Sequence, residues 1–258
     1  MYYIRGRLKK DIFSSVHFFM ISFSASLNNQ KNPVLLPVFD SDLRIRSRIL
    51  TRHLSPSQKR AVREAVRHGI APKSGLFPIY TRDQTVFVFV IEKKESFGTR
   101  DIRNTVTGIS DSLQRFRVKK LSVLPGSLTG DLLAAFREEL VLTMYEFSKI
   151  TEKKDDARDP RLSETHFFAK KNAKEEELRL KSMYEGVKLT KDLVNMPPDI
   201  ATPSYIVKIA QSIASKSRKF SLRVFGKKEL SAMKFGGILA VSRASSEDRQ
   251  VRPRGRQG

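Results

Sequence analysis

Apolar residues in the first half of the chain follow the patterns of a β-sheet. Residues 20–25 (MISFSA) alternate between apolar and polar, and residues 33–39 (PVLLPVF) are almost continuously apolar, as in a sheet covered on both faces. Residues 76–80 and 85–91 are β-branched and aromatic runs on either side of a short polar stretch, which predicts a hairpin with a central second strand. Residues 119–124 predict a further strand.

Between these strands, apolar residues recur at helical spacing. They predict helices over residues 56–68, 100–116 and 131–149. The first of these has a serine N-cap, Ser55, and a proline in its first turn, and Gly69 closes it. The order β, β, α, β, β, α, β, α predicts an α/β fold, a mixed sandwich of about 130 residues.

Composition changes after residue 150. Residues 151–161 (TEKKDDARDPR) carry almost no apolar side chain, which is typical of a linker, and a short strand is expected at 162–169. Residues 174–195 predict a long helix with an acidic start, as the helix dipole favours. The remaining elements are predicted in the order helix 203–215, strand 221–225, helix 228–233 and strand 237–241.

The long helix ends in a sharp corner. The double proline at 197–198 stops it, because each ring removes a backbone N–H and restricts the residue before it. Thr202 is a good N-cap and Pro203 a good first residue for the next helix. On the residues alone, the stretch is a rigid corner between two helices, in which Asn195 and Asp199 bond the backbone of the turn.

The corner also carries a specific string of residues. Residues 192–203 (DLVNMPPDIATP) closely resemble the D-L-x-N-x-P-P-N-x-x-x-P segment of the leucyl (cytosol) aminopeptidase family, with Asp199 in place of the usual Asn. In that family a small macro-like α/β domain is joined by a long helix to a catalytic domain that holds two divalent metals. The resemblance implies that the corner marks where the helix meets the catalytic domain and is not itself an active site.

Two other stretches resemble the same family. Residues 139–147 (ELVLTMYEF) are similar to its E-G-L-x-L-x-x-Y-x-F helix, and residues 227–241 resemble the opening of its catalytic domain. One departure is Ile91-Glu92, which stand where the family has glycines after a strand. The resemblance extends over about residues 20–247.

Pattern and resemblance together divide the chain. We expect an upstream extension at 1–19, a macro-like α/β domain at 20–150, a linker at 151–172, a connecting helix at 173–196, the incomplete beginning of a catalytic domain at 197–247, and a disordered tail at 248–258.

The motifs that hold the family's metals do not occur in this sequence. Those motifs, G-K-G-x-x-F-D-S-G-G and N-T-D-A-E-G-R, supply a lysine, several carboxylates and an arginine. The chemistry needs them because two close metals must bind the peptide's amine, polarise the scissile carbonyl and activate a water. We therefore expect no catalytic, cofactor-binding or metal-binding residue in this chain. The two divalent metals (zinc or manganese) that the resemblance implies belong to the missing part.

No substitute set of ligands stands out. The histidines are scattered without metal-ligand spacing and are expected to be surface or core residues: His17, His53, His68 and His166. The carboxylate runs at 155–156 and 175–177 are expected to be solvated. Gly236-Gly237 is a turn too short to cradle phosphate.

Composition adds a large basic excess. The chain has 49 Lys+Arg against 27 Asp+Glu, a formal net charge of +22, which favours an acidic partner such as nucleic acid or an anionic membrane. The basic residues are spread along the chain with no aromatic platform among them, so a solvated basic surface is the main expectation and nucleic acid the alternative. No apolar run is long enough to span a bilayer, although residues 5–26 imitate a signal peptide diluted by an aspartate, a histidine and serines.

Two functions are compatible with these observations. In the first, the chain is an inactive fragment of a leucyl aminopeptidase, which as the resemblance implies is a cytoplasmic, homohexameric metallo-exopeptidase acting on peptides. The absence of cysteine is compatible with such a reducing compartment. The alternative is a non-catalytic module that uses the macro-like domain to bind a partner, such as a nucleotide or nucleic acid.

Overall fold

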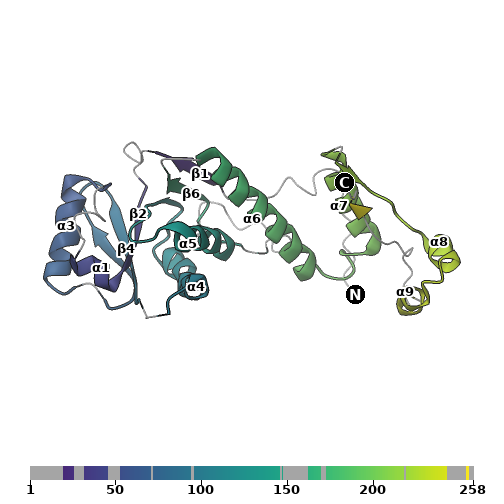
Figure 1. The fold of residues 1–258 in the computed structure, drawn as a ribbon, viewed down its shortest axis with the longest axis horizontal. Coiled ribbons are helices and arrows are strands. Elements are labelled where there is room, and N and C mark those ends of the chain that lie inside the picture. The colour runs from purple at the N-terminus through teal and green to yellow at the C-terminus, as the bar shows by residue number, and fades with distance from the viewer. Residues whose placement is uncertain are drawn as a thin grey trace, which may run out of the picture. The chain divides into compact units, whose positions relative to one another are not determined.

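The computed structural model describes residues 20–25, 32–45, 53–70, 72–93, 96–145, 147, 162–169, 173–217, 219–242 and 254–255. The chain divides into two compact units, Met1–Leu189 and Thr190–Gly258 (Figure 1). The expected extension at 1–19, the charged stretch at 151–161 and most of the expected tail lie outside the described residues.

A mixed six-stranded sheet forms the centre of the first unit. Its strands are β1 (Met20–Ser24), β2 (Val34–Phe39), β3 (Gly75–Tyr80), β4 (Thr85–Ile91), β5 (Lys120–Val123) and β6 (Glu164–Phe168). They lie in the order β1-β6-β5-β2-β4-β3, and each neighbouring pair is parallel except the antiparallel hairpin of β3 and β4. The hairpin, the position of β4 between two neighbours and the mixed α/β class are all confirmed.

Helices cover both faces of this sheet. The helices that contain residues of this unit are α1 (Asp40–Ile45), α3 (Pro56–Arg67), α4 (Thr99–Arg115), α5 (Gly130–Thr143) and α6 (Ala173–Asn195), within which the boundary between the units falls. Figure 1 shows α1 and α3 on one side of the strands and α4 and α5 on the other. Neighbouring residues of β2 face opposite cores, since Leu36 packs with Val62 of α3 and Leu35 packs with Val106 of α4. All six residues of β2 are buried, as its continuous apolar run predicted.

The start of α3 is held by its own side chains. The Ser55 hydroxyl accepts a hydrogen bond from the backbone N–H of Gln58 at 3.3 Å, and the Gln58 side chain accepts one from the Ser55 N–H at 2.8 Å. This reciprocal pair satisfies two N–H groups that a helix start otherwise leaves unbonded. The N-cap predicted from Ser55 and Pro56 is confirmed, and the helix ends at Arg67, one residue before the predicted end.

Three details of the first unit differ from the sequence predictions. The short strand expected at 162–169 is present as β6, but it lies between β1 and β5, so this part of the stretch 151–172 belongs to the sheet. The residues after β2 form the short helix α1, for which no element was predicted. Helix α5 ends at Thr143 instead of residue 149, and the Thr143 carbonyl oxygen accepts a hydrogen bond from the Ser110 hydroxyl of α4 at 3.3 Å. A tertiary contact of this kind is not visible in the helical pattern.

The second unit contains short elements after the end of α6. They are α7 (Pro203–Ser215), β7 (Phe220–Ser221), α8 (Lys227–Ala232), α9 (Gly236–Val241) and β8 (Arg254–Gly255). The predictions of α7 and α8 are confirmed. The strand predicted at 221–225 is confined to the two residues of β7, which pair antiparallel with β8 inside the stretch expected to be a disordered tail.

The strand predicted at 237–241 is wrong, because these residues form the helix α9. A strand needs a neighbour to bond its N–H and C=O groups, and within the described part of the second unit the only paired strands are β7 and β8. A helix satisfies those groups locally, as the bond from Leu239 N–H to the Phe235 carbonyl at 3.2 Å illustrates. An apolar run of five residues does not distinguish the two forms by its periodicity.

Candidate functional site

The corner after α6 has the geometry that its sequence predicted. Helix α6 ends at Asn195, one residue short of the double proline at 197–198. The Pro197 carbonyl accepts bonds from the N–H groups of Ile200 at 3.0 Å and Ala201 at 2.9 Å, which close the turn. The Thr202 side chain then accepts from the Tyr205 N–H at 3.3 Å and caps α7. The corner is therefore a fixed change of chain direction made by backbone bonds.

Helices α7 to α9 bury few of their apolar side chains. Ile209 of α7 and Leu230 of α8 are buried, and α9 has no buried residue. Large apolar side chains of these helices and their connections are exposed: Ile206, Ile213, Phe220, Met233, Phe235 and Val241. In soluble domains such surface is normally covered by further structure.

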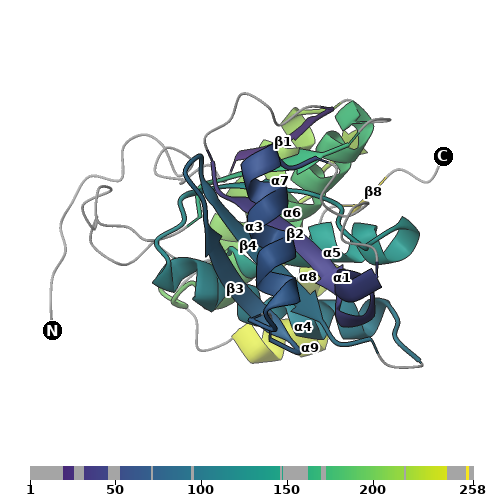
Figure 2. The same ribbon diagram turned by 90° about the vertical axis from the view of Figure 1, so that its left-hand side faces the viewer.

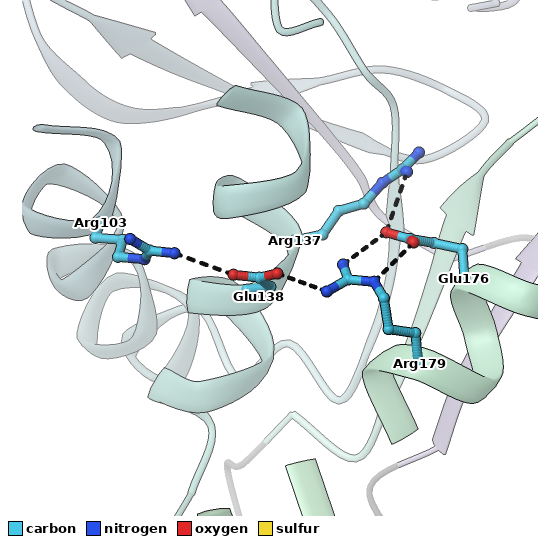
Figure 3. Close-up of polar contacts among 5 residues, drawn as sticks. All are labelled: Arg103, Arg137, Glu138, Glu176 and Arg179. Atoms are coloured by element: carbon cyan, nitrogen blue, oxygen red, sulfur yellow. Dashed lines mark hydrogen bonds and ion pairs between the residues drawn. The ribbon is translucent and has the colours of Figure 1, made fainter. Parts of the chain in front are cut away.

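A charged network in the first unit joins α4, α5 and α6 (Figure 3). Glu138 of α5 accepts hydrogen bonds from Arg103 of α4 at 3.1 Å and from Arg179 of α6 at 2.7 Å. Arg179 also donates two bonds of 3.0 Å to the two oxygens of Glu176. These bonds lower the pKa of Glu176 and raise that of Arg179, because each partner stabilises the charged form of the other.

Arg137 of α5 also belongs to this network. Its guanidinium donates to the Phe168 carbonyl of β6 at 2.8 Å and lies 3.9 Å from Glu176. It also lies over the rings of Phe23 and Phe167, 5.1 and 5.8 Å from their centres. Burial lowers the pKa of this guanidinium, and the carboxylate of Glu176 opposes that effect. The guanidinium thus contacts β1, β6 and α6 at once, so its role is to hold the end of the sheet against α6.

The acidic start of α6 was expected to be solvated, and the structure corrects this for two of its three carboxylates. Glu176 is bound as described above. Glu177 accepts a hydrogen bond from the N–H of Phe23 on β1 at 3.2 Å and pairs with Lys181 at 2.5 Å. The spacing from Glu176 to Arg179 and from Glu177 to Lys181 could have indicated these pairs within the helix. Nothing in the sequence indicated their partners on α5 and β1.

The described histidines of the first unit each have different contacts. The His53 ring packs against Phe168, with centres 4.1 Å apart, and His68 ends α3. His166 lies between the Ser22 hydroxyl and Glu164, whose carboxylate is 2.6 Å from the His166 ring nitrogen and 2.7 Å from Lys120. The bond from Lys120 is the main cause of a lowered pKa at Glu164. His17 and the aspartates at 155–156 lie outside the described residues.

These side chains do not form a metal centre. Across the described residues, no group of three or more histidines, cysteines, aspartates or glutamates is placed to hold a metal ion. The residues present therefore do not fit a centre of two divalent metals, and no catalytic step is assigned to them. The pair Gly236-Gly237 lies in the first turn of α9.

One end of the sheet is a common ligand site in α/β folds, namely the point where neighbouring parallel strands send their helices to opposite faces. Here the chain leaves β2 for α1 on one face and β5 for α5 on the other. The loop after β5 fills this point: Ser127 N–H donates to the Pro37 carbonyl at 3.0 Å, and Leu128 is fully buried. A Cβ added at Gly126 would lie 1.7 Å from the Pro37 oxygen. The loop after β5 is thus packed closely against β2 at this point.

None of the described helices combines the length and the apolar character that crossing a membrane requires.

Comparison with known proteins finds one family to which the chain is similar. Residues 188–253 match the catalytic domain of the cytosol aminopeptidase family. A probable cytosol aminopeptidase of Legionella pneumophila (strain Corby) is 24% identical over 193 residues, which are 74% of this chain and 40% of that protein. One of Ralstonia nicotianae is 43% identical over 65 residues, 25% of this chain and 13% of that protein. The chain thus spans less than half the length of these curated relatives.

A solved structure shows the same fold. A mutant of tomato leucine aminopeptidase superposes with a TM-score of 0.65 at 16% sequence identity, over 91% of this chain and 50% of that one. The matched catalytic-domain region, residues 188–253, includes the corner, whose geometry the structure bears out. The matched region and the curated relatives support the leucyl (cytosol) aminopeptidase family for this chain, and the solved structure shows the shared fold.

Proposed function

We propose that this chain is the part of a leucyl aminopeptidase that precedes the metal centre, and that it does not hydrolyse peptides by itself. The observation that carries the proposal is the match of residues 188–253 to a catalytic domain, together with a set of described side chains that offers no ligand group for metals. The family's chemistry requires a metal-activated water and a polarised carbonyl, which these residues do not supply.

The proposed division of labour follows the units of the chain. The α/β domain at 20–150, which we propose to be macro-like, and the connecting helix at 173–196 form the support, and residues 197–247 begin the catalytic domain. The extension at 1–19 is proposed to lie outside the family's fold. The tail at 248–258 overlaps the matched region up to residue 253, and β8 within it pairs with β7. The exposed apolar side chains of α7 to α9 support this division, because a catalytic domain would provide the structure that covers them.

For the complete protein we propose a cytoplasmic metallo-exopeptidase that uses two divalent cations, zinc or manganese, to release N-terminal residues from peptides as a homohexamer. The name that the curated relatives share, probable cytosol aminopeptidase, supports the activity and the compartment.

The test is an aminopeptidase assay on the purified chain. The chain is incubated with a fluorogenic leucyl amide and manganese or zinc, and a full-length leucine aminopeptidase serves as the positive control. We expect no turnover above a mock purification from the same host. Turnover that co-elutes with the chain in size-exclusion chromatography and that a chelator abolishes would contradict the proposal.

A further inference from the structure

Helix α3 presents a row of arginines on its outer face. Arg60, Arg63 and Arg67 are exposed, whereas Val62 and Ala65 of the same helix are buried against the sheet. Spacings of three and four residues place the arginines on one side of the helix, over about 10 Å of its length. Figure 2 looks onto this helix, which lies in front of the sheet.

No carboxylate pairs with these three arginines among the described residues of the first unit, in contrast to three arginines of α4, α5 and α6. Arg103, Arg137 and Arg179 each contact a glutamate. Of the three arginines on α3, only Arg63 has a side-chain hydrogen bond among the described residues, to the backbone carbonyl of Lys59 at 3.1 Å. The row therefore keeps its charge available on a rigid element.

The nearby carboxylates do not neutralise this row. Asp83, in the turn of the hairpin, accepts hydrogen bonds from the hydroxyls of Ser57 and Ser55 at the start of α3, the latter at 3.0 Å. Glu64 is the one carboxylate within α3, and it is exposed. Its single negative charge is outnumbered by the three arginines of the row and by Lys59 of the same helix. The whole chain has a net charge of +22.

We propose that the outer face of α3 binds the phosphodiester backbone of nucleic acid without reading its bases. Double-stranded DNA carries one negative charge per about 1.7 Å of its axis, so a 10 Å row meets roughly six phosphates, and binding is driven by the release of their counterions. Guanidinium groups suit this role because they bond phosphate oxygens through two N–H groups at once. This proposal is independent of the proposed peptidase fragment.

The chemistry of the helix favours nucleic acid over a lipid surface. A helix that lies on a membrane turns its apolar face outward into the lipid. The apolar residues Val62 and Ala65 of α3 instead face the sheet, and the exposed side carries charge. A lipid surface would meet no apolar anchor on this face.

The test measures binding of the full chain to a fluorescein-labelled 24-base-pair DNA of random sequence and to a 24-nucleotide RNA, by anisotropy between 50 and 300 mM KCl. The variant carries Arg60→Gln, Arg63→Gln and Arg67→Gln. The control carries Arg100→Gln, Arg115→Gln and Lys174→Gln, which remove the same charge from exposed positions on α4 and α6. We expect the α3 variant to bind at least 10-fold more weakly at 100 mM KCl and its salt slope to fall by about 2 to 3, with the control within 2-fold of wild type.

Several results would overturn the proposal. They are an absence of binding by the wild-type chain, an equal loss in both variants, an unchanged α3 variant, or binding only to vesicles of phosphatidylserine and phosphatidylcholine. Circular dichroism checks that the variants are folded. A variant with lysine at all three positions of α3 must retain most of the binding, because an ammonium also neutralises phosphate.

Discussion

Replacing Arg137 by alanine tests whether the guanidinium under α6 holds the end of the sheet. The change removes a charged hydrogen bond of 2.8 Å to the Phe168 carbonyl, worth about 1.5–3 kcal/mol, and the contacts over Phe23 and Phe167, worth about 0.5–2 kcal/mol. Relief of the desolvation that lowers the pKa of Arg137 offsets part of this loss. The expected net cost to the free energy of unfolding of the first unit is about 2–4 kcal/mol.

The measurement combines urea unfolding with hydrogen exchange of amides in β1 and β6. If these strands exchange through unfolding of the unit, a loss of that size accelerates them roughly 30- to 1,000-fold. The matched control is Arg103→Gln, since the Arg103 side chain is 47% exposed and its pair with Glu138 should contribute only about 0–1 kcal/mol. Arg137→Lys should fall between the two, because one ammonium cannot replace all the contacts of the guanidinium.

The reasoning is refuted if Arg137→Ala costs no more than Arg103→Gln, or if exchange accelerates equally in β3, at the opposite edge of the sheet, without a change in the urea midpoint.

Three further predictions concern other parts of the molecule. Gly126→Ala should lower the thermal midpoint of the first unit by several degrees or prevent its folding. The new Cβ would lie 1.7 Å from the Pro37 carbonyl oxygen, and Gly126 has a positive φ of 58°. An unchanged midpoint would contradict the close packing of this loop. Amides of α7 to α9 should exchange much faster than those of α4 and β4, because the second unit buries few apolar side chains, and equal protection in a monomeric sample would contradict this expectation. Glu164→Gln should lower the urea midpoint at pH 7 and leave it nearly unchanged at pH 3. The folded pKa of Glu164 lies below its unfolded value of about 4.3, so its stabilising effect is lost as the pH falls through the folded pKa. A variant that is equally destabilised at both pH values would contradict this.

Local signals explain why most of the elements could be predicted. Alternation and continuous apolar runs located the strands, and the residues that start and stop helices located α3 and α7, since these effects act within a few residues. The double proline located the corner for the same reason. Proline and N-cap chemistry do not depend on the rest of the fold.

Long-range contacts explain what could not be predicted. The position of β6 between β1 and β5 depends on pairing with strands that are distant in the sequence. The helix α9 depends on whether a neighbouring strand is present, which an apolar run does not encode. The engaged state of Glu176 and Glu177 depends on Arg137, Arg179 and β1. The absence of the metal motifs, by contrast, could be seen from the sequence alone, because those ligands are defined by residue type and spacing.

The place of β6 in the sheet also affects the order in which the chain can fold. Among the strands that the structure describes, β1 pairs only with β6, and the contact between Ser22 and His166 joins residues 144 positions apart. At a synthesis rate of about 5–20 residues per second, β6 leaves the ribosome roughly 7–30 s after β1. During that interval β1 has no partner strand, and the apolar side chains of Ile21 and Phe23 stay exposed. Docking of β1 must therefore be a late step in the folding of the first unit, and until then chaperones can bind this segment.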